Sequence, residues 1–215
     1  MISKLIRRYE VGTAPMTQMP DKRRLLPFMV LCLLGFVTTA RADFVYVLNS
    51  TDPSIVKIDS RTGEDVIRID SLREVHHLVL APGGKELLIA DSAANEILFV
   101  EPGSGTVLRR ERISNPYHLD FSPDGRLLVI ASLRRGQVDI YDANGLKLLE
   151  RMRAGNKPSH IAFSPDSRFA FVTIQGDGTV IAIDLQERRI AWRANVGSEP
   201  AGIIWHRNKL IVGIM

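Results

Sequence analysis

Short apolar runs alternate with polar turns along residues 43–215. In one representative stretch the runs cover 118–121, 127–131, 137–141 and 146–152, and the turns between them read Ser-Pro-Asp-Gly, Arg-Arg-Gly and Asp-Ala-Asn-Gly. The runs are too short for helices and are rich in Val, Ile, Leu, Phe and Tyr, as strands are. Proline and glycine supply the backbone angles that tight turns need. The pattern therefore predicts β-strands joined by turns.

Several of these runs are apolar at every position, as in Leu127–Ile130. A strand with one face exposed to water alternates apolar and polar residues, whereas a strand buried on both faces is apolar throughout. We therefore expect sheets that are covered on both sides.

The strand pattern recurs with a period of about 42 residues. The anchors are prolines at 116, 158 and 200, histidines at 77, 118 and 160, and an acid that closes an apolar run at 59, 101, 142 and 184. The sequences around these anchors are also similar, as in PYHLDFSPDGR at 116–126 and PSHIAFSPDSR at 158–168. Weaker copies lie at 75–85 and 200–209. Repeats of about 40 residues with four short strands each predict an all-β fold, a β-propeller of four-stranded blades.

The phase of the repeat bears on domain organisation. Residues 44–47 align with 127–130, the second strand of a unit, and residues 209–215 form the second strand of a fifth unit. We therefore expect residues 43–215 to form a partial propeller domain, with four blades and part of a fifth. The complete form is expected to have six to eight blades.

Residues 1–42 have the features of a secretory leader. A basic cluster at 22–24 precedes a mostly apolar run at 25–37, and Ala40 and Ala42 form the small-x-small pattern of a cleavage site. This pattern predicts a signal peptide cut between Ala42 and Asp43, and a periplasmic or secreted bacterial protein. Residues 1–17 lie upstream of the basic segment of an ordinary signal peptide, and a start at Met16 or Met19 would make the residues before it a mis-called extension.

Charge and cysteine content narrow the function classes. The chain has a formal net charge of +4, but residues 1–42 hold seven basic and two acidic residues, so 43–215 carry one net negative charge. We expect no nucleic-acid partner, because phosphate binding needs a concentrated basic surface. The remaining basic group, Arg109, Arg110 and Arg112, is interpreted as a solvated edge strand. The single cysteine, Cys32, lies in the leader, which excludes thiol catalysis in 43–215 and suits an oxidising compartment.

The repeat motif also carries a family resemblance. The pattern Pro-x-His-apolar-x-Phe-Ser-Pro-Asp-Gly-Arg, with the opening Phe-Val-Tyr-Val-Leu-Asn at 44–49, resembles the YVTN family of bacterial β-propeller repeat proteins, within the YncE-like and cytochrome d1-like superfamily. Related propellers include lactonases, haem d1-binding domains, surface-layer modules and quinoprotein-associated proteins. The resemblance thus implies a fold and leaves the function open.

The propeller fold indicates where a ligand site would lie. The first strand of each blade lines the central channel, and His77, His118 and His160 each begin such a strand. Loops between second and third strands share the same face, and we predict a polar, ligand-binding funnel there. Its loop residues are Asn49, Asp91, Arg134 and Gln175.

Three interpretations of the histidines stay open. In the first, each imidazole hydrogen-bonds a backbone group of the adjacent blade and repeats because the blade repeats. In the second, the histidines bind a metal or a haem-like cofactor, and a haem-sized ligand fits better because residues on different blades diverge from the axis. The third is acid–base catalysis, as in the resembling lactonases.

Two sets of acidic residues are interpreted as structural, with a role in forming turns. The first set closes the apolar runs, and the second belongs to the Pro-Asp turns; both are expected to accept backbone N–H groups. The residues are Asp59, Glu101, Asp142 and Asp184 in the first set, and Asp124 and Asp166 in the second.

These observations predict an exported propeller that binds a periplasmic protein or a small ligand and has no catalysis of its own. One alternative is a propeller that binds haem d1 or another cofactor in periplasmic redox chemistry, and a second is a lactonase-like hydrolase. Membrane contact is expected only through the signal peptide.

Overall fold

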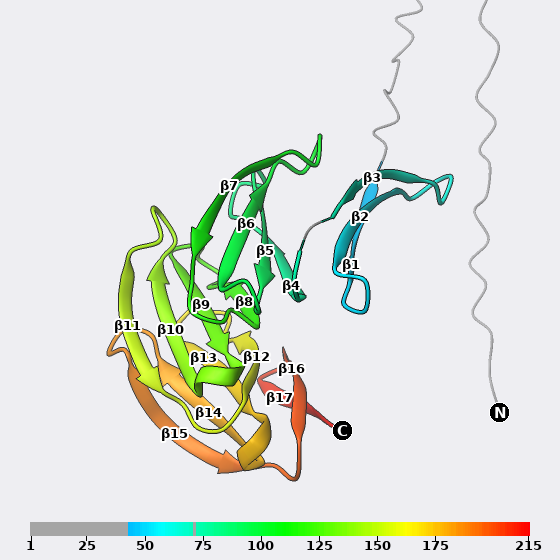
Figure 1. Ribbon diagram of the computed structural model, residues 1–215. Helices are drawn as coiled ribbons and strands as arrows, with labels where there is room; N and C mark the ends of the chain where they lie inside the picture. Colours follow the sequence, from blue (N-terminus) through cyan, green and yellow to red (C-terminus); the bar gives the residue numbers. More distant parts are fainter. Residues whose placement is uncertain (1–42, 71) are drawn as a thin grey trace, which may run out of the picture. The chain divides into compact units, whose positions relative to one another are not determined.

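The computed structural model describes residues 43–70 and 72–215, which belong to one compact unit. The predicted signal peptide and its last residue, Ala42, lie outside the described residues. The described chain is all-β, with seventeen strands and two single 3₁₀ turns (Figure 1).

The strands form five antiparallel sheets that follow one another along the chain, here called blades 1 to 5. Blade 1 contains β1 (Phe44–Asn49), β2 (Ser54–Asp59) and β3 (Asp65–Ile69). Blade 2 contains β4 (Val75–Leu80), β5 (Leu87–Asp91), β6 (Glu96–Val100) and β7 (Val107–Arg112). Blade 3 contains β8 (His118–Phe121), β9 (Leu127–Ser132), β10 (Gln137–Asp142) and β11 (Leu148–Arg153). Blade 4 contains β12 (Pro158–Phe163), β13 (Phe169–Ile174), β14 (Thr179–Asp184) and β15 (Arg189–Asn195), and blade 5 contains β16 (Pro200–His206) and β17 (Lys209–Ile214).

This topology confirms the predicted blades. In blades 2, 3 and 4 the strands pair in chain order, so each blade is a four-stranded meander. One predicted boundary is wrong, because the outer strand of blade 3 begins at Leu148 and not at Leu146. The cause is local: Gly145 and Leu146 have φ angles of 93° and 53°, which place both residues in the turn.

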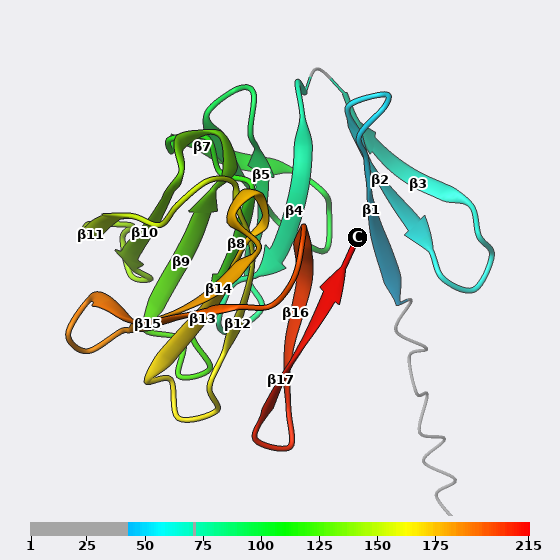
Figure 2. The same ribbon diagram turned by 90° about the horizontal axis from the view of Figure 1, so that it is seen from below.

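The first strands of successive blades lie side by side. Strand β8 contacts β4 on one side and β12 on the other, and β12 also contacts β16 (Figure 2). These inner strands are where neighbouring blades meet most closely.

The core lies between the blades. Every residue of β14 and all but the first of β9 are buried, which confirms the prediction of strands covered on both faces. Between blades 2 and 3 the buried side chains include Phe99, Leu119 and Tyr141. Removal of this apolar surface from water is the main force that holds the blades together.

The turns opposite the inner-strand starts confirm the structural role of the acids. Asp59, Glu101, Asp142 and Asp184 each accept a backbone N–H from the residue two positions on. Asp124 and Asp166 do the same in the Pro-Asp turns, with Arg126 and Arg168 as donors. Such bonds lower the carboxyl pKa, as the backbone N–H of Arg61 does at Asp59.

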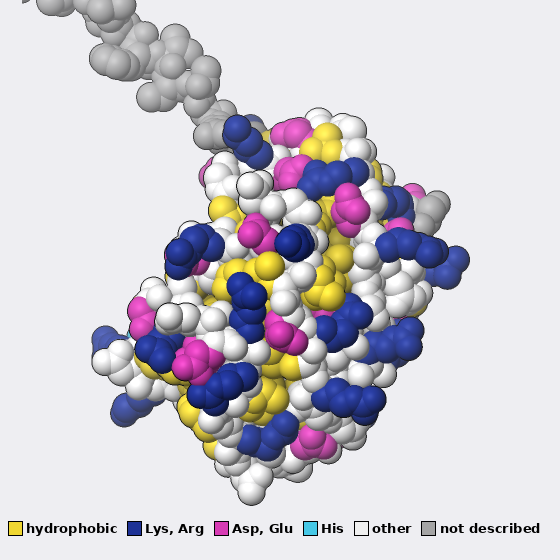
Figure 3. All heavy atoms as spheres, turned by 90° about the vertical axis from the view of Figure 1, so that its left-hand side faces the viewer, with side chains coloured by type: hydrophobic (Ala, Val, Ile, Leu, Met, Phe, Trp, Pro, Cys, Tyr) yellow, Lys and Arg dark blue, Asp and Glu magenta, His cyan; other side chains and the backbone are white. Residues whose placement is uncertain are grey.

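The outer strands carry a second repeat, which the sequence analysis missed. An arginine stands at the same register position of each one, opposite a buried residue of the preceding strand: Arg68 opposite Val56, Arg110 opposite Leu98, Arg151 opposite Asp139 and Arg193 opposite Ile181. Basic and acidic side chains are interspersed on the outer face (Figure 3). Exposed β7 fits the solvated edge strand predicted for its arginines.

Candidate functional site

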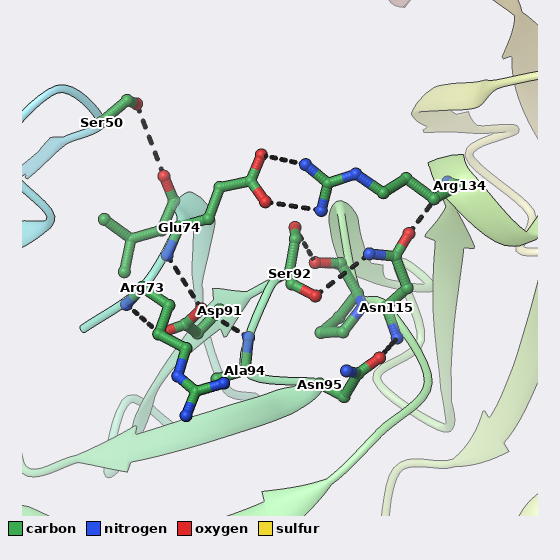
Figure 4. A network of polar contacts seen from close by, with 11 residues as sticks. Ser50, Arg73, Glu74, Asp91, Ser92, Ala94, Asn95, Asn115 and Arg134 are labelled. Atoms are coloured by element: carbon green, nitrogen blue, oxygen red, sulfur yellow. Dashed lines mark hydrogen bonds and ion pairs between the residues drawn. The ribbon is translucent and has the colours of Figure 1, made fainter.

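The top face is defined by the starts of β4, β8, β12 and β16 and by the loops that follow β1, β5, β9 and β13. Asp91 ends β5 and is fully buried. Its carboxylate accepts the backbone N–H groups of Arg73 (2.8 Å), Glu74 (3.0 Å) and Ala94 (3.0 Å) (Figure 4). Asp91 therefore fixes the entry of the chain into blade 2, and its carboxylate faces backbone groups rather than an open funnel.

Asn115 joins blades 2 and 3 on this face. Its side-chain amide donates to Ser92 O (3.0 Å), and its side-chain oxygen accepts the backbone N–H of Arg134 (2.9 Å). Its own backbone N–H donates to the side chain of Asn95 (3.0 Å), while Ser92 Oγ donates to Pro116 O (2.5 Å). Figure 4 shows how these bonds run from one blade to the next. They cross-link the loops and hold the face in one geometry.

Arg134 lies on the top face as predicted, but a protein carboxylate engages its guanidinium. Its two terminal nitrogens contact the two carboxylate oxygens of Glu74 at 2.6 and 2.7 Å (Figure 4). This bidentate pair joins the turn that follows β9 to the residue before β4. Arg134 thus contributes to blade alignment.

Gln175 begins the turn after β13 as predicted, whereas Asn49 is the last residue of β1 and is paired with Ser54 rather than placed in the loop. The Asn49 side chain donates to Ser54 Oγ (3.1 Å), which closes its own hairpin. The backbone N–H of Gln175 donates to Lys157 O (2.9 Å) and fixes the turn that follows β13.

Two of these loops have the same backbone. The 3₁₀ turns Leu133–Arg135 and Gln175–Asp177 are preceded by residues with φ and ψ of −109° and 89°, and −108° and 87°. Both end on a glycine in the left-handed region, Gly136 at φ 64° and Gly178 at φ 67°. One backbone therefore carries Leu-Arg-Arg in blade 3 and Gln-Gly-Asp in blade 4.

The three predicted histidines converge. The rings of His77 and His118 stack at 3.7 Å between centroids with 27° between their planes, and His160 lies 5.0 Å from His118. Two residues that the sequence analysis did not select join them: His76 packs on Tyr117 at 3.8 Å, and Tyr117 meets His160 edge-on at 6.1 Å. We call these five residues the imidazole cluster.

His76 enters the cluster although simple strand alternation points it away from His77. The register of β4 against β5 shifts between Val75 and His77, which marks a bulge. A bulge reorients the side chains beside it. In the sequence, an aromatic residue stands directly before the anchor histidine in two repeats, as His-His and Tyr-His. That shared position could have indicated that both rings of each pair join the cluster.

Burial keeps the cluster uncharged at neutral pH. His118 is 7% exposed, and the Nδ1 atoms of His77 and His118 are buried without a hydrogen-bond partner among the described residues. Burial, reinforced by neighbouring imidazoles, lowers the pKa of His118 to about 2 and that of His77 to about 4. Burial also lowers the pKa of His160, whose Nδ1 lies 2.8 Å from Ser159 Oγ.

These distances bear on the first two interpretations. The expected divergence of the histidines from the axis is wrong, because inner strands of adjacent blades lie side by side and bring the rings into contact. In residues 43–70 and 72–215 no group of three His, Cys, Asp or Glu side chains is placed to hold a metal ion. His77 has the backbone hydrogen bond to the adjacent blade that the first interpretation expects, at Leu119 of β8, whereas His118 is held by ring packing.

Comparisons with known proteins agree with the blades. A family described as the YNCE-like beta-propeller matches residues 29–214. The chain belongs to this family. Among solved structures, this YNCE-like propeller is similar to the hydrazine synthase of Kuenenia stuttgartiensis, with a TM-score of 0.64 and 16% identity over 74% of the chain. The match covers 47% of the hydrazine synthase chain, so the YNCE-like propeller spans about half its length.

The family match confirms the resemblance drawn from the repeat motif, and the structural likeness confirms the propeller fold. Matching chains of known structure number 1296, so the likeness is shared too widely to single out a function. No curated protein matches the chain significantly. Among the described residues no helix has the length and apolar character needed to cross a membrane.

Proposed function

We propose that this YNCE-like propeller is an exported periplasmic scaffold that binds a partner protein on its top face and has no catalysis of its own. The observation that supports this most directly is the pair of matching 3₁₀ turns. They present different side chains from one backbone geometry, as recognition loops on a rigid framework do.

The framework beneath these turns is already ordered. Asp91, Asn115 and the Glu74–Arg134 pair fix the loops of blades 2 and 3 through contacts within the protein. A partner that docks on such a face need not order the loops, which lowers the entropic cost of binding. Exposed Arg135 and half-buried Gln175 remain at the surface of this ordered face.

The cellular location is part of the same proposal. The small-x-small pattern at Ala40 and Ala42 supports export, and a mature chain without cysteine suits the periplasm.

The test is photo-crosslinking in the native periplasm with the full-length protein. A photoreactive residue at Arg135 or Gln175 samples the top face, and one at Lys147 or Glu187 samples exposed turns on the opposite face as the matched control. We expect one discrete protein adduct from the top positions and none from the controls. Equal adducts from both faces, or none from either, contradict the proposal.

The predicted alternatives give different signals. An absorption spectrum and metal analysis of the same preparation test the cofactor-binding propeller. A Soret-like band, or metal in stoichiometric amount, would support a cofactor-binding role in redox chemistry if it is lost in His118→Ala. That result would contradict the scaffold proposal. A lactonase-like hydrolase would open a lactone ring in a metal-dependent reaction, and mutation of top-face residues would abolish that activity. This result would also contradict the scaffold proposal.

A further inference from the structure

The imidazole cluster joins three blades at their inner strands. His76 and His77 belong to β4 of blade 2, Tyr117 and His118 lie at the start of β8 of blade 3, and His160 belongs to β12 of blade 4. The cluster holds four of the five histidines of the chain. Ring contacts therefore link three strands that share no backbone hydrogen-bond ladder with one another.

The groups around the cluster offer little compensation for a positive charge. Immediately before β4 lies Glu74, which acts on His76 but is paired with Arg134 from the turn after β9. On β8, Asp120 lies two residues beyond His118, and burial raises its pKa, which favours its neutral form. On β12 the neighbouring polar group is the hydroxyl of Ser159. Within 43–70 and 72–215 no imidazole of the cluster forms an ion pair.

We infer that the imidazole cluster is an acid-sensitive joint, closed while its rings are neutral and opened when protons from solvent charge them. A neutral imidazole stacks on its neighbour as an aromatic ring. An imidazolium in the same place lacks water and a carboxylate, and a second one beside it adds repulsion. The strands relieve both costs by separating, which admits water to the rings.

The direction of the pH effect follows from proton binding. Between about pH 6.5 and the lowered pKa values of His77 and His118, the unfolded or opened chain takes up protons that the closed chain does not. Stability is therefore complete above about pH 6.5 and is lost as the pH falls. For an opened-state pKa of about 6.5, the shift from pH 7 to pH 5 raises the opening constant about 25-fold per buried histidine.

The joint also reaches the top face. The bonds from Ser92 to Pro116 and from Asn115 to Ser92 lie immediately before β8, the strand in the middle of the cluster. Separation of β8 from β4 would strain these cross-links, so opening the joint also disturbs the top face. The acid response of the joint does not depend on whether the top face binds a protein.

The test compares unfolding of the full chain at pH 7 and pH 5. His118→Phe keeps an aromatic ring but cannot be protonated, and His206→Phe is the matched control, since His206 is exposed at the end of β16. We expect the rise in the unfolding constant between the two pH values to be about 25-fold smaller in His118→Phe and unchanged in His206→Phe. An equal rise in His118→Phe and the wild type overturns the inference.

Two measurements on the wild type stand even if the His118 variant does not fold. Histidine NMR titration is expected to show His77 and His118 staying neutral between pH 7 and pH 5 until the chain opens. Hydrogen exchange at pH 5, corrected for the intrinsic rate, is expected to lose protection first in β4, β8 and β12. A normal titration of His118 in the closed protein, or first loss in the outer strands, contradicts the joint.

Discussion

The arginine repeat of the outer strands leads to a sharp prediction at Arg151. Its guanidinium donates to both carboxylate oxygens of Asp139, at 2.9 and 2.8 Å. The Asp139 carboxylate is completely buried, while 46% of the Arg151 side chain is exposed. In the other repeats the residue opposite the arginine is apolar: Val56, Leu98 or Ile181. Only this blade, among those described, buries a carboxylate at that position.

The two halves of this pair should respond unequally to mutation. Arg151→Met leaves a buried carboxylate with only the Gln137 amide and the Tyr141 hydroxyl, each at 3.3 Å. Loss of the counter-charge of a buried ion costs about 3–5 kcal/mol of unfolding free energy. Asp139→Ile installs the type of residue that the other repeats have, and the freed arginine can extend into water. We expect that change to cost under about 1 kcal/mol, and the double variant to recover most of the Arg151→Met loss.

Urea unfolding, followed by fluorescence of Trp192 and Trp205, measures these differences. Arg110→Met is the matched control, because Arg110 holds the same register position but pairs with Glu96, whose side chain is 20% exposed. It should cost no more than about 1 kcal/mol. The reasoning is refuted if Arg151→Met costs no more than Arg110→Met, or if Asp139→Ile is as damaging as Arg151→Met.

Three further predictions concern single features. Asp91→Ala removes the acceptor of three backbone N–H groups and should cost about 2–4 kcal/mol in urea unfolding, whereas a loss under about 1 kcal/mol would contradict the structural role. Gly136→Ala places a Cβ 2.7 Å from Gly155 O at φ 64° and should lower the melting temperature more than Gly63→Ala, which at φ 73° meets no atom within 4 Å. Intact mass spectrometry of the periplasmic protein should find a chain that begins at Asp43, and a chain that retains residues 1–42 would disprove cleavage.

The parts of the fold that were predictable are those that depend on local sequence and its period. Asp59 and Glu101 lie two residues before the N–H groups that they accept, so the sequence alone indicates the bond. The run Leu127–Ile130 is apolar throughout because β9 is covered on both faces, and the sequence shows this directly. The boundary at Leu146 failed because an apolar residue stands in a left-handed turn conformation, where glycine is the usual signal.

The candidate site was harder to predict, because its contacts cross between blades. Asp91 and Arg134 were correctly placed on the top face, but the sequence could not show that backbone N–H groups and Glu74 engage them. The histidine anchors were found by their spacing, whereas their 3.7 Å stacking depends on how closely β4 and β8 approach. The repeated arginines were missed because further basic residues, such as Arg109, Arg112 and Arg153, stand close to two of them and obscure the period.

The matching turns after β9 and β13 have a consequence for protein engineering. Their flanking dihedral angles agree within 3°, and each turn begins after a buried strand and ends on a left-handed glycine. The turn after β9 can therefore take Gln-Gly-Asp on its existing backbone, whereas the reverse exchange replaces Gly176, where a Cβ would collide with Asn156. Surface chemistry can thus be changed without changing the backbone in blade 3, while blade 4 requires a glycine at the middle of its turn.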